Sequence, residues 1–204
     1  MLIEVYADIL CPWCYIGKRR LSAALAGLEE RVEVVWRSFE LGPDASREPG
    51  VSAAEAMREW WGDETEARVA RIRSLGAAEG LDLAMDRARP VNTFDAHRLI
   101  HLATERGLGD AMAERLLRAY HTEGLNVADL GVLAGLGVEA GVESAEAHAV
   151  LNGDRYAERV REDERRGRAR GIGGVPTLVI AEGAPMSAVR SPELLREAVL
   201  AALA

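Results

Sequence analysis

The sequence predicts an α/β fold in which the strands come from the two ends of the chain and a long helical segment separates them. Apolar and polar residues alternate over 2–7 and again over 32–41, and a run rich in β-branched residues lies at 175–180. Between 46 and 170, helix start and stop signals recur with little that resembles a strand. A chain of 204 residues, 49% of them hydrophobic, can bury a core of the size this fold needs.

The first strand is expected to end at Asp8 and to be followed at once by a helix. Pro12 suits the first turn of that helix, where its missing N–H has no partner to lose. The helix is predicted to end near Glu30, and the second strand to occupy 32–41. Because a helix connects the two strands, they are predicted to be parallel.

The middle of the chain, 45–170, is predicted to be an inserted all-helical domain that includes the connecting helix. No repeat of fixed period is present, which argues against a solenoid. The predicted N-caps are Ser52 (with Glu55 as a capping box), Asp63 (with Glu66), Asp110, Asp129 and Ser144, and the predicted helix stops are Gly76, Gly107 and Gly124.

The end of the chain returns to strands. The run 175–180 and the short segment 186–189 flank a turn and are predicted to form a hairpin, after which Ser191 caps a final helix with Pro192 at its first position. Residues 1–44 and 171–204 are therefore predicted to form one domain, with 45–170 inserted in it. The order βαβ, helical insertion, ββα is that of a thioredoxin fold.

A Cys-x-x-Cys tetrapeptide, Cys11-Pro12-Trp13-Cys14, stands where the first helix is expected to begin. The N-terminus of a helix has unpaired N–H groups and the positive end of the helix dipole, and both stabilise a thiolate. Cys11 is therefore predicted to be the attacking thiol. Cys14, inside the first turn, is predicted to resolve a mixed disulfide formed at Cys11. A bridge closing so short a loop adds little stability, so the pair indicates redox chemistry.

Composition excludes several classes of partner. The net charge of −8 gives no attraction to nucleic acid or to an anionic membrane surface. No apolar stretch is long enough to span a bilayer, and no leader precedes Cys11, so a cytoplasmic location is expected. A zinc site is not predicted, because zinc needs about four ligands and the nearest histidine pair, His97 and His101, lies far along the chain.

Several further residues are candidates for the site. Asp8 either tunes protonation at the redox turn or caps the loop. His97 either shuttles a proton for Cys14 or is a hydrogen-bonded packing histidine, which helical context favours. Trp60 and Trp61 either line a substrate groove or anchor the insertion, and anchoring is favoured because large aromatic residues usually serve packing.

With this order of elements, the chain resembles the DsbA-like thioredoxin superfamily and, within it, the FrnE-like dithiol oxidoreductases. The resemblance implies that a helical domain covers the active site, that Cys11 is the nucleophile and Cys14 the resolving thiol, that Pro176 is cis, and that Val175 offers its backbone to an extended substrate segment. Pro12 and Trp13 are also substrate-binding candidates. The matching segments are Tyr6-Ala7-Asp8, Cys-Pro-Trp-Cys-Tyr-Ile-Gly-Lys at 11–18, Val-Val-Trp-Arg-Ser-Phe-Glu-Leu at 34–41, Asn-Thr-Phe-Asp-Ala-His-Arg-Leu at 92–99 and Gly-Val-Pro-Thr at 174–177.

One segment departs from this pattern. Ser187-Ala188-Val189-Arg190 stands where family members tend to have Ser-Gly-Ala-Gln. The lost glycine bears on how closely a ligand or partner can approach the hairpin.

The function that these residues favour is thiol–disulfide oxidation, reduction or isomerisation on a protein or a low-molecular-weight thiol. No cofactor beyond the Cys11–Cys14 couple is expected, with glutathione a candidate co-substrate. Two alternatives stay open. The fold is also similar to glutathione-dependent hydroxychromene-carboxylate isomerases and kappa-class transferases, although these generally carry serine at the catalytic turn. The chain could also be a redox-sensing binding module whose helical insertion recruits a partner.

Overall fold

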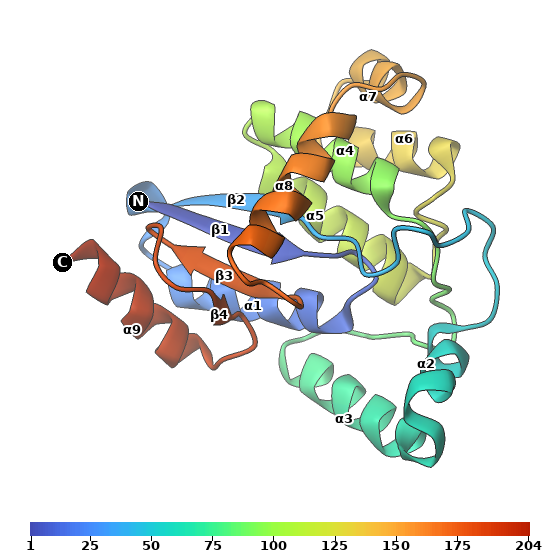
Figure 1. Cartoon of the computed structure of the whole chain (residues 1–204), viewed down its shortest axis with the longest axis horizontal. Helices are drawn as coiled ribbons and strands as arrows, with labels where there is room; N and C mark the ends of the chain where they lie inside the picture. The colour runs from blue at the N-terminus through green and yellow to red at the C-terminus, as the bar shows by residue number, and fades with distance from the viewer.

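The computed structural model describes residues 1–204 and is built around a four-stranded sheet in the order β2-β1-β3-β4 (Figure 1). The strands are β1 (Leu2–Ala7), β2 (Glu33–Ser38), β3 (Thr177–Ile180) and β4 (Met186–Ser187). β1 and β2 are parallel, while β3 is antiparallel to both β1 and β4. The predicted parallel pair and the predicted hairpin are therefore confirmed.

Helices cover both faces of the sheet. α1 (Pro12–Leu25) and α9 (Pro192–Leu203) pack together on one face, and α8 (Ala157–Ala169) crosses the other face against β2 (Figure 1). Gly167 of α8 lies so close to Tyr6 that an added Cβ would be 3.1 Å from the ring. Along the chain, β1, α1 and β2 come before the helical segment and β3, β4 and α9 after it, which is the thioredoxin order βαβ…ββα.

The segment between β2 and β3 contains only helices and turns. Its α-helices before α8 are α2 (Ala53–Trp61), α3 (Thr65–Ala78), α4 (Phe94–Glu105), α5 (Gly109–Arg118), α6 (Leu130–Glu139) and α7 (Ser144–Leu151), with a π-helical turn at Ala119–Glu123 and a 3₁₀ turn at Gly62–Glu64. Figure 1 shows α4–α7 gathered at one end of the sheet, while α2 and α3 stand apart from them, with α3 packed against α1. All four strands, α1 and α9 lie within 1–44 and 171–204. That these two segments form one domain and 45–170 an inserted second one remains our proposal. None of the helices has the length and the apolar character that a membrane-spanning segment requires.

Several predicted helix boundaries are confirmed. Ser52 and Glu55 form a reciprocal capping box at α2. Asp129 accepts the Val132 N–H at the start of α6, and Ser191 caps α9 ahead of Pro192. Side chains that reach back to a free backbone N–H at the first turn are local interactions, which is why the sequence predicts them well.

Other predicted boundaries are wrong. Asp110 and Ser144 lie inside the first turns of α5 and α7, one or two residues beyond the actual N-caps. Asp63 lies in the 3₁₀ turn that leads directly into α3, so no extended residue precedes that helix. Gly76 lies inside α3, where an added Cβ would be 2.5 Å from Leu83, so it makes room for a neighbour and does not end the helix. α1 ends at Leu25, short of Glu30, and a separate 3₁₀ turn occupies Glu29–Arg31.

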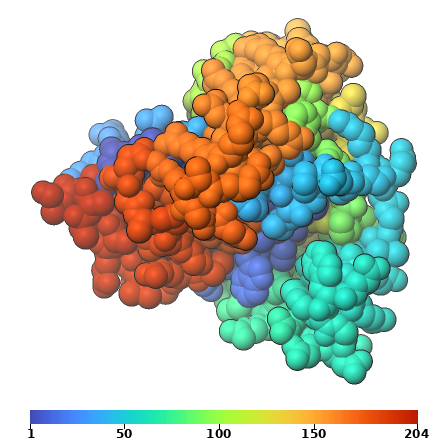
Figure 2. Space-filling view, in the orientation of Figure 1, coloured from blue at the N-terminus to red at the C-terminus, as the bar shows by residue number.

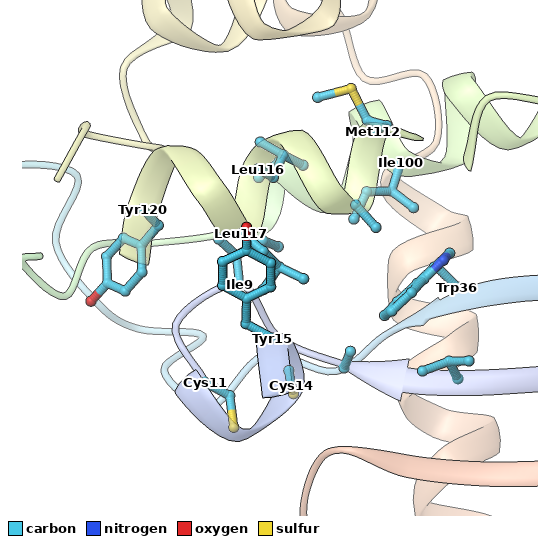
Figure 3. Packing of buried hydrophobic residues seen from close by; sticks show 14 of the residues in the cluster. Ile9, Cys11, Cys14, Tyr15, Trp36, Ile100, Met112, Leu116, Leu117 and Tyr120 are labelled. Atoms are coloured by element: carbon cyan, nitrogen blue, oxygen red, sulfur yellow. The ribbon is translucent and has the colours of Figure 1, made fainter. Parts of the chain in front are cut away.

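One buried apolar cluster joins the sheet to the helical segment and includes both cysteines. Ile9 and Tyr15, on either side of the redox turn, pack toward α5 at Leu116 and Leu117 (Figure 3). The redox turn is therefore held by packing from both parts of the chain.

Candidate active site

Cys11 and Cys14 lie on one turn at the start of α1 (Figure 3). Cys11 is the N-cap residue, with an extended backbone, and Pro12 is the first helical residue. The Cys11 N–H donates to the carbonyl of Asp8 at 3.2 Å, and the Cys14 N–H donates to the carbonyl of Cys11 at 3.0 Å. Both thiols are free and nearly buried, 5% exposed for Cys11 and 1% for Cys14. The attacking position is thus the more accessible of the two.

The Val175–Pro176 peptide bond is cis and lies directly against the nucleophile. The Cys11 thiol donates to the carbonyl oxygen of Val175 at 3.6 Å. Gly17 of α1 permits this approach, because an added Cβ would lie 3.1 Å from Pro176 and 3.2 Å from the methyl group of Ala188. Ala188, which stands at the departure from the Ser-Gly-Ala-Gln pattern, is buried and directs its methyl group at this glycine and away from solvent.

Cys14 is protonated at neutral pH. Burial, first of all, raises the pKa of the Cys14 thiol well above its usual range, and the adjacent Cys11 and the negative charge of Asp8 add to the increase. A resolving thiol must be a thiolate when it attacks. This position therefore needs a base within reach.

Asp8 and His97 lie together in the interior next to the redox turn. Asp8 Oδ2 accepts the Leu41 N–H at 2.7 Å, while Oδ1 lies 3.4 Å from Nε2 of His97. Oδ1 of Asp8 and Nε2 of His97 have no hydrogen-bond partner. The Asp8 side chain is 0% exposed and that of His97 is 3% exposed. A cavity of about 10 Å³ at the pair has the size of one water molecule. The fold thus places both tuning candidates together, and Asp8 close enough to act on Cys14.

Glu40 is a second buried carboxylate in the same region, and the sequence did not single it out. Its side chain is fully buried and pairs with Arg161 at 2.5 Å, while Oε1 has no hydrogen-bond partner. Burial raises the pKa of Glu40, against the opposing charges of His97 and Arg161. His97 therefore lies near two buried carboxyl groups.

His121 is a further residue that the sequence did not indicate, because no motif surrounds it. It lies in the π-helical turn, stacked on Tyr15 and edge-on to Tyr120, with ring centroids 6.0 and 4.8 Å apart. Burial lowers the pKa of His121 to about 4, against the backbone groups of Ile9 and Cys11, so the ring is neutral at pH 7. Its Nε2 is buried with no hydrogen-bond partner. π-helical turns are rare and occur often at functional sites.

Two hollows open at the redox turn, one on each side of Trp13, which lines both. The first is an apolar cavity of about 310 Å³ between the turn and α2–α3, lined among others by Cys11, Met57, Trp60, Trp61, Ile72 and Tyr120. The second is a groove of about 740 Å³ between α3 and the β3–β4 hairpin, lined among others by Val175, Pro176 and Met186. Figure 2 shows α2–α3 standing apart from the C-terminal part of the chain, with a notch between them.

The anchoring role predicted for both tryptophans is wrong for Trp60. Trp60 is 72% exposed and borders the apolar cavity, while Trp61 is partly buried against the core. Their positions differ because they are consecutive residues on one helix and so point in different directions. Trp60 presents an aromatic ring at the mouth of the cavity that contains Cys11.

Comparison with known proteins agrees with this architecture. The model of the DSBA-like thioredoxin domain family matches residues 2–199. The probable DsbA oxidoreductase SCO1869 of Streptomyces coelicolor is 35% identical and superposes with a TM-score of 0.91, covering 99% of this chain and 89% of its own. An uncharacterized protein of Bacillus subtilis, YwbO, is 26% identical over 182 residues, which is 88% of this chain and 86% of that protein.

A more distant structure shows the fold alone. The cytosolic disulfide reductase DsbM of Pseudomonas aeruginosa is 22% identical with a TM-score of 0.69, covering all of this chain and 98% of its own. It has also been solved with glutathione (GSH).

Proposed function

Because the chain belongs to the DsbA-like thioredoxin domain family, we propose that it is a disulfide oxidoreductase whose redox couple is Cys11 and Cys14. The observation that carries this proposal is the position of Cys11 at the N-cap of α1, with its sulfur 3.6 Å from the carbonyl of Val175. The helix terminus stabilises the thiolate, and the backbone of Val175 offers a hydrogen-bonding edge to a substrate beside the sulfur. Membership in the FrnE-like group remains a prediction.

The proposed reaction is two successive thiol–disulfide exchanges. The Cys11 thiolate attacks one sulfur of a substrate disulfide, and the other substrate sulfur leaves as a thiolate. Cys14 loses its proton and attacks the Cys11 sulfur, which releases the second substrate thiolate and leaves a Cys11–Cys14 bridge. Two electrons pass from the enzyme dithiol to the substrate. In the reverse direction, the bridge takes two electrons from a substrate dithiol.

Asp8 and His97 supply the proton transfer in this proposal. The charge of Asp8 raises the pKa of Cys14. Oδ1 of Asp8 lies 3.4 Å from Nε2 of His97 and accepts no hydrogen bond. We assign to Asp8 the removal of the Cys14 proton and to His97 the orientation of the carboxylate. Both act on the resolving step and not on the first attack.

Substrate binding is assigned to the residues around the nucleophile. Pro12 and Trp13 border the apolar cavity, and Trp13, Val175 and Pro176 border the groove on the other side. The substrate is a protein or a low-molecular-weight disulfide or thiol, in a cytoplasmic setting, with no metal or organic cofactor. Glutathione is the candidate co-substrate, in keeping with the glutathione complex of the more distant DsbM.

The redox state of the purified protein across a series of glutathione potentials tests the proposal. Thiol trapping should show one two-electron transition, whose midpoint says whether the protein is poised as oxidant or reductant. Cys11→Ser should abolish exchange, and Cys14→Ser should accumulate the mixed disulfide at Cys11.

Failure to form the Cys11–Cys14 bridge at any potential would refute the proposal. Activity that requires glutathione but tolerates Cys14→Ser would favour the glutathione-dependent isomerase or transferase instead. Partner binding that changes on oxidation, without turnover, would favour the redox-sensing module.

A further inference from the structure

The groove on the Pro176 side of Cys11 has an electrostatic character opposite to that of the whole protein. The chain carries a net charge of −8, yet the only charged residues that line this groove are Arg20 and Arg71. The groove begins at Val175, whose carbonyl lies 3.6 Å from the Cys11 sulfur, and runs between α3 and the β3–β4 hairpin. A substrate group that extends from the reacting sulfur on this side would meet positive charge.

The two arginines differ in how their charge is used. Arg20 donates to Glu79 at 2.7 Å and to the carbonyl of Val189 at 2.6 Å, so an acid within the chain already neutralises it. Arg71 is exposed on α3 and has neither an ion pair nor a side-chain hydrogen bond. Its neighbours on α3 are both paired, Arg68 with Glu64 and Arg73 with Asp86.

The opposite wall of the groove has hydrogen-bond donors that the chain does not use. The N–H groups of Gly173 and Gly174 make no backbone hydrogen bond. A Cβ at either residue would have no atom within 4 Å, so packing does not require glycine at these positions. Bare backbone of this kind lets a ligand approach closely, and N–H groups suit a negatively charged one. Both walls therefore favour an anion.

We propose that this groove is a carboxylate-binding subsite and that Arg71 determines specificity, selecting thiol or disulfide substrates with a carboxylate on the part that extends past Trp13 toward α3. This inference rests on the proposed function, because the subsite acts only on a molecule held at Cys11. The shared chemistry is a carboxylate near the reacting sulfur, as in an anionic low-molecular-weight thiol or in an acidic peptide segment. The guanidinium of Arg71 can bind such a carboxylate through two parallel hydrogen bonds.

Single-turnover exchange between the reduced protein and disulfides of different charge tests this proposal. The probes are glutathione disulfide, hydroxyethyl disulfide, which is uncharged, and cystamine, which is cationic. Arg71→Gln should lower the second-order rate constant for glutathione disulfide about fivefold to tenfold, the range expected for losing a charge-assisted hydrogen bond at an exposed site. The measured quantity is the ratio of the rate constant for glutathione disulfide to that for hydroxyethyl disulfide. Arg71→Glu should lower this ratio further and should raise the rate constant for cystamine.

Arg73→Gln is the matched control, because it removes a positive charge from the same helix outside the groove, and it should leave the ratio unchanged. A cysteine peptide disulfide with flanking glutamates, set against one with flanking lysines, distinguishes the two sources of carboxylate. If only the acidic peptide depends on Arg71, the substrate is a polypeptide. A ratio that is the same in the wild type, Arg71→Gln and Arg73→Gln for all probes would overturn the inference while leaving the proposed function intact. No reaction of the wild type with any probe would refute the proposed function itself.

Discussion

Gly17 of α1 and Pro176 of the cis peptide bond lie so close together that a side chain on Gly17 would be crowded against the proline ring. A Cβ built on Gly17 would lie 3.1 Å from Cγ of Pro176 and 3.4 Å from the backbone oxygen of Ala188. The contact holds the loop before β3 against the first turns of α1. The Cys11 sulfur and the Val175 carbonyl, 3.6 Å apart, are therefore positioned by a glycine six residues beyond the nucleophile.

Gly17→Ala should destabilise the protein and slow thiol–disulfide exchange. Alanine favours a helix by about 1 kcal/mol over glycine, but overpacking against a rigid proline ring and backbone costs about 1–3 kcal/mol. Gly135→Ala on α6 is the matched control, since no atom lies within 4 Å of a Cβ built there. This variant should be stabilised by the higher helix propensity of alanine alone. Urea unfolding of both variants measures the difference. Equal stabilisation of Gly17→Ala and Gly135→Ala would show that the loop at Pro176 moves to make room for a methyl group at no cost in free energy.

Trp60→Ala should lower the reactivity of aromatic disulfides with little effect on stability. Trp60 is 72% exposed, so its removal should change the free energy of unfolding by less than about 0.5 kcal/mol. Its ring borders the cavity of Cys11, and a lost aromatic contact there should slow exchange with dithiodipyridine about threefold to tenfold. Leu200→Ala, an exposed apolar residue on α9, is the control. Equal slowing with hydroxyethyl disulfide would contradict a role in recognising aromatic groups.

The sequence predicted best the features that depend on interactions between residues close together in the chain. The strand at β1, the helix beginning at Pro12 and the capping box at Ser52 depend on patterns a few residues long, and the structure has all three. The parallel pairing of β1 with β2 followed from the helical connection between them. The family resemblance extended this reading to Val175 and Pro176, which no local pattern connects to Cys11.

Contacts between distant segments were not predictable in the same way. Asp8 and His97 are separate candidates in the sequence, and nothing in either segment indicates that the two side chains lie 3.4 Å apart. No pattern in its own segment indicates a role for His121, because its environment comes from Tyr15 of another helix. The direction of Trp60 depends on how α2 sits beside the redox turn, which periodicity does not specify.

Acid should destabilise the protein in a pH range set by His121. The pKa of His121 in the folded protein is about 4, against an ordinary value of 6.5. The unfolded chain therefore takes up a proton between these pH values that the folded protein does not, so stability falls as pH drops through the range and this loss stops below pH 4. The contribution amounts to about 3 kcal/mol. Urea unfolding at several pH values measures it.

His121→Gln should flatten this part of the pH profile, because glutamine does not titrate. His148→Gln is the matched control, since His148 hydrogen-bonds at the surface of α7. An unchanged slope in His121→Gln would mean that other groups cause the acid destabilisation.

Asp8→Asn separates two roles that the geometry allows for this carboxylate. The negative charge of Asp8 raises the pKa of Cys14, so if Asp8 acted through its charge alone, removing it would ease ionisation of Cys14 and speed the resolving step. If Asp8 is the base, the resolving step should instead slow by about tenfold or more at neutral pH, and increase in rate with pH in the variant. Asparagine can still accept the Leu41 N–H, so the loop should keep its structure.

Acid quenching followed by mass spectrometry of the glutathione mixed disulfide at Cys11 measures this step directly. A long-lived mixed disulfide in Asp8→Asn, with an unchanged rate of its formation, assigns the base to Asp8. Asp86→Asn, which removes a surface carboxylate paired with Arg73, controls for net charge. Equal slowing of both steps would mean that Asp8 supports the loop and not the proton transfer. His97→Gln then tests orientation, because it should slow the resolving step less than Asp8→Asn does and leave the first attack unaffected.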